Sequence, residues 1–300
     1  MNILIALFPL IILIAMGYVL KRQQFVQDAF WANSEKLNYF ILFPILLFSN
    51  LSAVQLNLNA ILKLLIAFFI IVLCASALLW GLKALYSIPV ARFGVYLQSH
   101  VRFNTYIGLA LMGALYGSEG MQIFAMLIAV AIPVVNILSV MSFSQGQTGQ
   151  WANTLWSIVK NPLILGCVVG VLFNLSGLQL FVGMDALLKI LASMSLPLGL
   201  LSVGAALQFS QLKLDLQRLS INTFGRLMLM PSFAFGIASW LQLDALQSVI
   251  IVTFFALPTA SASYILTRYF KGDSQLMAGV ISLQTLCFAL SFPLLMWLLY

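Results

Sequence analysis

FFALPTASASYILTR, residues 254–268, decides the fold, because a proline and several hydroxyl side chains interrupt an otherwise apolar segment. Pro258 lacks a backbone N–H and clashes with the preceding turn, which kinks or opens a helix at a cost of about 3 kcal/mol. Thr259, Ser261 and Ser263 can satisfy the carbonyls that such a break leaves without donors. Proline beside serine or threonine is also common in plain spanning helices, so this segment alone predicts only a kink.

A second apolar segment is interrupted at an equivalent position. QSHVRFNTYIGLALMG, residues 98–113, has a polar cluster in its middle, and a shift of 154 residues places Thr105 on Thr259 and Glu119 on Asp273. A shift of 153 aligns two further helix pairs, through the matches Pro9 with Pro162, Gly17 with Gly170, Pro44 with Pro197 and Ser49 with Ser202. The chain is therefore predicted to be an internal repeat, with two broken helices at corresponding positions.

The composition places these helices in a membrane. The 300 residues are 63% apolar and 7% charged, whereas soluble domains are about 25% charged. A spanning helix needs about 20 apolar residues, so the length allows about ten. The predicted spans lie near 2–20, 37–51, 61–82, 93–116, 121–143, 162–175, 186–207, 219–241, 245–269 and 275–299.

An odd number of spans in each copy makes the second copy insert upside down, so five plus five helices predict inverted repeats, the architecture of secondary transporters. We assign residues 1–143 to the first repeat, 144–160 to a cytoplasmic linker and 161–300 to the second repeat. In such carriers the substrate binds near the midplane, where equivalent helices are interrupted. The fourth and ninth helices are therefore the predicted site.

The basic residues predict the orientation. With the N-terminus outside, ten lysines and arginines fall on inner loops and helix ends, and only Lys63 and Lys189 fall outside. This positive-inside bias predicts that both termini of a multi-pass protein face away from the cytoplasm, in the inner or plasma membrane. The net charge of +7 is thereby explained without a nucleic-acid partner.

Arg102 indicates the charge of the substrate. A central arginine costs about 2.5–3.5 kcal/mol in a spanning helix, and all seven acids map to loops or helix ends. A guanidinium beside half-helix N-termini favours an anion, most simply a carboxylate. The alternative is that Arg102 snorkels to a surface or pairs with carbonyls. Arg226 lies about two turns into the eighth span, where we expect snorkelling.

Other polar residues are expected around the same cavity. Asn136 in the fifth span and Gln284 in the tenth are central and polar. His100 could relay a proton, because its reference pKa is about 6.5, although a lone histidine is more often structural. The predicted substrate-binding residues are Arg102, Asn104, Thr105, Pro258, Thr259, Ser261, Asn136 and Gln284.

Catalysis, metals and cofactors are not expected. One histidine without a nearby acid supplies neither a nucleophile with its base nor a set of metal ligands. The three cysteines, Cys74, Cys167 and Cys287, stand apart in apolar stretches, with no partner at ligand spacing.

Seven stretches in order resemble the auxin efflux carrier family of bacterial and plant transporters: FPLIILIAMGYVLKR, YFILFPILLFSNL, RFNTYIGLAL, NPLILGCVVG, LPLGLLSVGAAL, GRLMLMP and LPTASASYILTR. The resemblance implies an architecture like that of sodium/proton antiporters and bile-acid symporters. Helices 1, 2, 6 and 7 would form a scaffold, through which we expect a homodimer, and helices 3–5 and 8–10 a mobile core. The fourth and ninth helices would cross at Asn104 with Thr105 and at Pro258 with Thr259.

The resemblance also implies organic-anion substrates, which are auxin for plant members and small carboxylates for bacterial members. Two features differ from many relatives: Ala110 stands where they have a proline, and the long central loop of plant members is absent, which suggests a bacterial protein. The predicted function is elevator-like efflux of small organic anions, driven by membrane potential. Two alternatives stay open, proton-coupled carboxylate uptake through His100 and a membrane sensor that binds a ligand without moving it.

Overall fold

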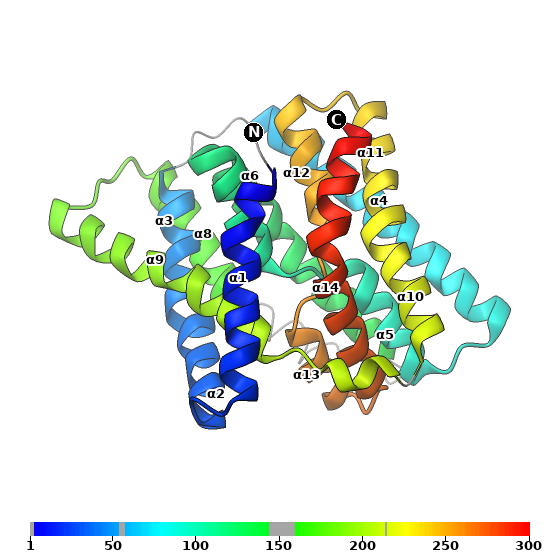
Figure 1. The fold of residues 1–300 in the computed structure, drawn as a ribbon. Helices are drawn as coiled ribbons and strands as arrows, with labels where there is room; N and C mark the ends of the chain where they lie inside the picture. Colours follow the sequence, from blue (N-terminus) through cyan, green and yellow to red (C-terminus); the bar gives the residue numbers. More distant parts are fainter. Residues whose placement is uncertain (1–2, 54–57, 144–159, 214) are drawn as a thin grey trace. The chain divides into compact units, whose positions relative to one another are not determined.

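The computed structural model describes residues 3–53, 58–143, 160–213 and 215–300, and these segments contain helices and connecting turns but no strand (Figure 1). The helices cover most of each of the ten stretches that the sequence predicts as spans. The predicted linker, apart from Lys160, lies outside the described residues. The chain divides into two compact units, each built from both halves of the sequence.

The first unit contains the described residues among 1–57, 109–133 and 151–206. Its helices are α1 (Ile3–Arg22), α2 (Asp28–Leu37), η1 (Asn38–Leu42), α3 (Phe43–Ser52), α8 (Pro162–Leu175) and α9 (Val182–Ala205). Within it, α1 packs against α9 and α3 packs against α8.

The second unit contains the described residues among 58–108, 134–150 and 207–300. Its helices are α4 (Leu58–Tyr86), α5 (Val90–Val101), η3 (Phe209–Lys213), α10 (Leu216–Phe224), η4 (Gly225–Leu229), α11 (Met230–Trp240), α12 (Ala245–Ala256), α13 (Ala262–Tyr269) and α14 (Ser274–Leu299). The element α6 (Thr105–Phe143) consists of two helical segments joined by a kink at Gly117, where φ is 60° and ψ is −147°. It belongs to the first unit over residues 109–133 and to the second at both ends. Every residue of the predicted site lies in the second unit.

Five helical stretches in the described parts of the chain are long and apolar enough to cross a membrane. They are Ile3–Arg22, Ile61–Tyr86, Val90–Phe143, Val182–Ala205 and Ser274–Leu299. Their outward side chains are largely apolar, and Leu4, Ile5 and Leu290 are among the most exposed. An aqueous surface would not carry so many such residues, so the chain is an α-helical membrane protein.

Prolines widen two helices locally. A proline inside a helix has no N–H for the carbonyl four residues earlier, and its ring clashes with that carbonyl. Pro44 follows the π-helical turn η1, and Pro231 follows the π-helical turn η4. In both cases the carbonyl that loses its donor belongs to the widened turn. The wide turn η4 begins at Gly225 and holds Arg226, and both residues enter the site described below.

One helix contact in the first unit occurs twice, with the partners exchanged. A Cβ atom on Gly17 of α1 would lie 2.0 Å from the carbonyl oxygen of Leu201 on α9, and one on Gly170 of α8 would lie 3.1 Å from the Cα of Phe48 on α3. A shift of 153 residues carries Gly17 to Gly170 and Phe48 to Leu201. Glycine is needed at position 17, where the helices touch backbone to backbone, and it allows a close approach at position 170.

The turns between helices recur at the same spacing. Positive φ angles occur in the described residues at Gln24 (54°), Ser87 (49°), Gly117 (60°), Gly177 (69°), Gln242 (51°) and Lys271 (54°). Gln24 and Gly177 are 153 residues apart, Ser87 and Gln242 are 155 apart, and Gly117 and Lys271 are 154 apart. Left-handed backbone is uncommon outside glycine, so three such pairs at nearly one spacing reproduce the sequence repeat in the backbone.

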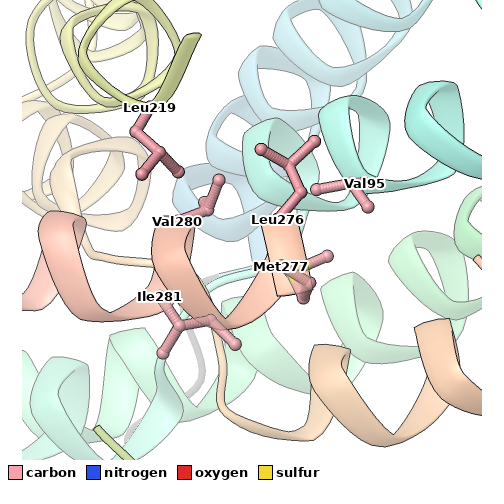
Figure 2. Close-up of a cluster of buried hydrophobic side chains, with 6 residues drawn as sticks. All are labelled: Val95, Leu219, Leu276, Met277, Val280 and Ile281. Atoms are coloured by element: carbon pink, nitrogen blue, oxygen red, sulfur yellow. The ribbon is translucent and has the colours of Figure 1, made fainter. Parts of the chain in front are cut away.

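An apolar cluster holds three helices of the second unit together. Figure 2 shows its six buried side chains, Val95 from α5, Leu219 from α10, and Leu276, Met277, Val280 and Ile281 from α14. These three helices also carry the polar side chains that meet at the helix breaks. The cluster therefore fixes the elements from which the candidate site is built.

Candidate functional site

Both predicted helix interruptions are present. The backbone leaves the helix after Val101 of α5 and re-enters it at Thr105 of α6, and Arg102 between them is extended, with φ −82° and ψ 146°. The second gap separates Ala256 of α12 from Ala262 of α13. Leu257 is extended there, with φ −63° and ψ 144°, as expected for a residue that precedes a proline.

The two breaks are joined by a backbone hydrogen bond. The N–H of Asn104 donates to the carbonyl of Pro258 over 2.8 Å. These residues are 154 apart, which is the shift that aligns the two interrupted segments in the sequence. The reciprocal bond cannot form because Pro258 has no N–H.

Asn104 also starts α6. Its side-chain Oδ1 accepts the N–H of Ile107 over 3.1 Å, and its carbonyl accepts the N–H of Gly108. This is the arrangement of an N-cap, which satisfies donors that a new helix leaves open. The chain therefore opens and restarts this helix with Ala110, not a proline, near its start.

Four buried side chains close a hydrogen-bonded ring beside the breaks, which we call the polar ring: Ser99 of α5, Asn222 of α10, Thr259 of the second break and Gln284 of α14. The Asn222 amide donates to Ser99 Oγ over 2.8 Å, and the Gln284 amide donates to Asn222 Oδ1 over 3.0 Å. Gln284 Oε1 accepts the backbone N–H of Thr259 over 2.8 Å.

The Thr259 hydroxyl closes the polar ring. It lies 2.7 Å from Gln284 Oε1 and 3.0 Å from the carbonyl oxygen of Ser99, and its single proton can serve either acceptor. Polar groups buried in this way are stabilising only when they are satisfied. The polar ring therefore fixes the second break to α5, α10 and α14.

Arg226 donates hydrogen bonds at both breaks. Its side chain is 0% exposed, so the expectation that it snorkels to a surface is wrong. Nε donates to the carbonyl of Leu257 over 2.8 Å, Nη2 to that of Phe254 over 3.2 Å, and Nη1 to that of His100. These three carbonyls belong to the C-terminal ends of α5 and α12, which have no partners within their helices.

Arg102 differs from the expected buried, unpaired guanidinium. It is half-buried, and it is not without an interaction. Arg102 still places a positive charge in the first break, next to Asn104.

The remaining predicted residues divide into three groups. Pro258, Thr259 and Gln284 meet at the breaks through the bonds given above. Thr105 and Ser261 are half-buried at the starts of the two restarted helices. Asn136 is half-buried on α6 and takes no part in the polar ring.

His100 is held by its own helix. Its Nδ1 lies 2.8 Å from the carbonyl oxygen of Tyr96, which can only accept, so Nδ1 carries the proton. Nε2 faces Gly225, where a Cβ atom would lie 2.8 Å from it. Gly225 therefore leaves room for the imidazole directly beside Arg226, and this bonding is typical of a structural histidine.

Three residues of the site were not predicted from the sequence, and Ser99 of the polar ring is one of them. Asn222 was missed, and Arg226 was assigned to a surface, although the two are one helical turn apart in an apolar segment. Two polar residues four apart on one helix lie on the same face, and this spacing was the available signal. The partners of Arg226 are backbone carbonyls, which leave no mark in a sequence.

Acidic residues of the second unit lie at helix starts. Asp215, Asp244 and Asp273 accept N–H groups at the starts of α10, α12 and α14. Among the residues that the structure describes, no three His, Cys, Asp or Glu side chains are grouped as metal ligands would be.

Comparisons with known proteins agree with a carrier. Residues 150–296 match the model of a family described as membrane transport proteins. The chain is also 23% identical over 202 residues to a protein described as an uncharacterized transporter from Methanothermobacter thermautotrophicus. That alignment covers 67% of this chain and 66% of the relative, just under two thirds of the relative's length.

The resemblance to auxin efflux carriers is thus confirmed over residues 150–296, and this family is one of membrane transporters rather than of enzymes. The matched range includes Arg226, Pro258, Thr259 and Gln284. Residues 150–296 are therefore similar to the membrane transport protein family of auxin efflux carriers.

Proposed function

We propose that the protein is a secondary transporter that exports small organic anions, with carboxylates as the substrate class. The observation that carries the proposal is the bond from Asn104 to Pro258, which joins two interrupted helices at equivalent positions of the repeat. In inverted-repeat carriers, such breaks lie at the substrate site because they expose backbone N–H and C=O groups.

The charges beside the breaks favour an anion. Arg102 and Arg226 are the basic side chains there, and the described acids of the second unit are at the helix starts given above. The N-termini of α6 and α13 also begin at the breaks and carry partial positive charge. A carboxylate suits both a guanidinium fork and backbone N–H groups. Arg102, Asn104, Thr105, Thr259 and Ser261 are the proposed contacts.

Export fits the energetics. With an interior-negative potential, each negative charge that leaves gains about 2.3 kcal/mol per 100 mV, so efflux needs no coupled ion. His100 is bonded as a structural residue, which favours this route over proton-coupled uptake. The proposal places the protein in the inner or plasma membrane with both termini outside the cytoplasm.

The structure supports parts of the wider architecture. The exchanged contacts of Gly17 and Gly170, and the left-handed turns at one spacing, are what two inverted copies would produce. The four predicted scaffold helices lie almost entirely in the first unit, which also contains residues 109–133 of α6. We propose that core helices move against this scaffold to present the site to alternate sides, in a homodimer formed through the scaffold.

A flux assay tests the proposal. Purified protein in sealed vesicles is screened with labelled mono- and dicarboxylates, and we expect saturable movement of at least one. Arg102→Ala should abolish that movement while leaving the melting temperature in detergent unchanged. Arg268→Ala, on the exposed end of α13, is the matched control and should transport normally. Full transport by Arg102→Ala would contradict the anion site, and binding without flux would favour a sensor.

A further inference from the structure

Arg226 serves two helix ends at once. Its guanidinium is completely buried and donates to carbonyls at the C-terminus of α5 and at the C-terminus of α12. The third helix involved is its own, because η4 follows α10 directly. A side chain that only filled space would not need three donors directed at two separate helix ends.

The charge of Arg226 matches what those ends require. A helix C-terminus carries about half a negative charge, so two of them amount to roughly one. In carriers with broken helices, such C-terminal ends and unwound carbonyls coordinate the coupling Na⁺ or H⁺. Here one guanidinium already holds carbonyls at both C-terminal ends.

We infer that Arg226 is a resident cation that takes the place of a mobile coupling cation at the two half-helix C-termini. The inference rests on the proposed transport function and adds to it the reason why no cation is needed. Because Arg226 neutralises the negative helix ends, the positive N-termini of α6 and α13 are left to set the sign of the site. Arg226 is thus a positioning residue that acts through the two half-helices.

Cation rescue tests this role in a measurement that does not depend on transport. Arg226→Ala removes the charge and leaves a space the size of the lost side chain, and guanidinium chloride at millimolar concentration is the probe. We expect guanidinium to raise the melting temperature of Arg226→Ala in detergent, compared with the same concentration of N-methylglucamine chloride. At a guanidinium concentration of about ten times its dissociation constant from this variant, the rise should be about 3 °C.

Wild type and Arg218→Ala are the controls for the melting experiment. Arg218 is exposed on α10 and pairs with Asp215, so its loss should create no site for guanidinium. Neither control should be stabilised. No stabilisation of Arg226→Ala by guanidinium, or equal stabilisation of the controls, would overturn the inference.

Flux measurements on the wild type and on other Arg226 variants also test the inference, and they can be made even when Arg226→Ala does not fold. Wild-type flux of a labelled carboxylate should be the same in Na⁺, K⁺ and N-methylglucamine buffers. Arg226→Gln should lose flux by about tenfold or more, because buried carbonyls lose their charged donors, and Arg226→Lys should retain much of it. A wild type that requires Na⁺ or K⁺, or equal loss in the Lys and Gln variants, would overturn the inference. A wild type that moves no carboxylate would refute the proposed function, and the melting experiment would still decide the role of Arg226.

Discussion

Gln284 is the side chain on which the polar ring depends most. It accepts the backbone N–H and the hydroxyl of Thr259 and donates to Asn222, so it connects α14 to the second break and to α10. Its own side chain is 0% exposed. A buried polar group that loses its partner there is left unsatisfied, so the polar ring must be complete or it destabilises the fold.

We therefore expect Gln284→Met to destabilise the protein strongly. Methionine keeps the volume but leaves the Thr259 N–H and the Asn222 oxygen without partners, at about 1–3 kcal/mol for each buried group. The melting temperature in detergent should fall by several degrees. Gln217→Met, at an exposed position on α10, is the matched control and should be nearly neutral. Equal melting of the two variants would show that the polar ring does not stabilise the breaks.

The sequence indicated part of this site. Pro258 predicted its own break because its effect on a helix is local, and Gln284 was recognised as a central polar residue. The hydrogen bonds of Arg226 could not be predicted, since their acceptors are carbonyls of residues 28, 31 and 126 positions away. The half-burial of Arg102 was not predicted, because its central place in an apolar span does not show how exposed a residue in an extended break is.

Among the helices, close packing in the first unit depends on two glycines. Gly17 of α1 meets the backbone of α9, and Gly170 of α8 meets α3, through contacts that exchange under the repeat shift. The sequence aligned these glycines as repeat equivalents, but it did not show that both serve as contact points. Helix packing of this kind needs small residues because side chains would hold the backbones apart.

Alanine substitutions at three glycines should destabilise the protein in the order of how little space surrounds each new Cβ atom. Gly17→Ala should lower the unfolding free energy most, by about 1–3 kcal/mol from overpacking, because its Cβ atom would lie 2.0 Å from a carbonyl oxygen. Gly170→Ala, with its nearest atom 3.1 Å away, should be milder. Gly81→Ala on α4, where nothing lies within 4 Å, should be neutral or stabilising. Melting in detergent measures the order, and a Gly17→Ala protein as stable as Gly81→Ala would contradict the contact.

Across the whole chain, the two halves of the sequence contribute to both compact units. Each half of the sequence supplies helices to the first unit and one of the two helix breaks to the second. The positions of the helices were predictable from apolar length, and the breaks from proline and clustered polar residues. The grouping of residues 109–133 with the first unit was not, because it depends on long-range packing that no local pattern records.

The most direct test of the central claim is the voltage dependence of carboxylate efflux from vesicles that contain the purified protein. At an interior-negative potential of about 100 mV, each exported charge gains about 2.3 kcal/mol. Outward flux of a labelled carboxylate should therefore rise with the potential and fall when the potential is reversed, without an added Na⁺ or pH gradient. Carboxylate flux that is absent, or that is indifferent to the imposed potential, would contradict the account.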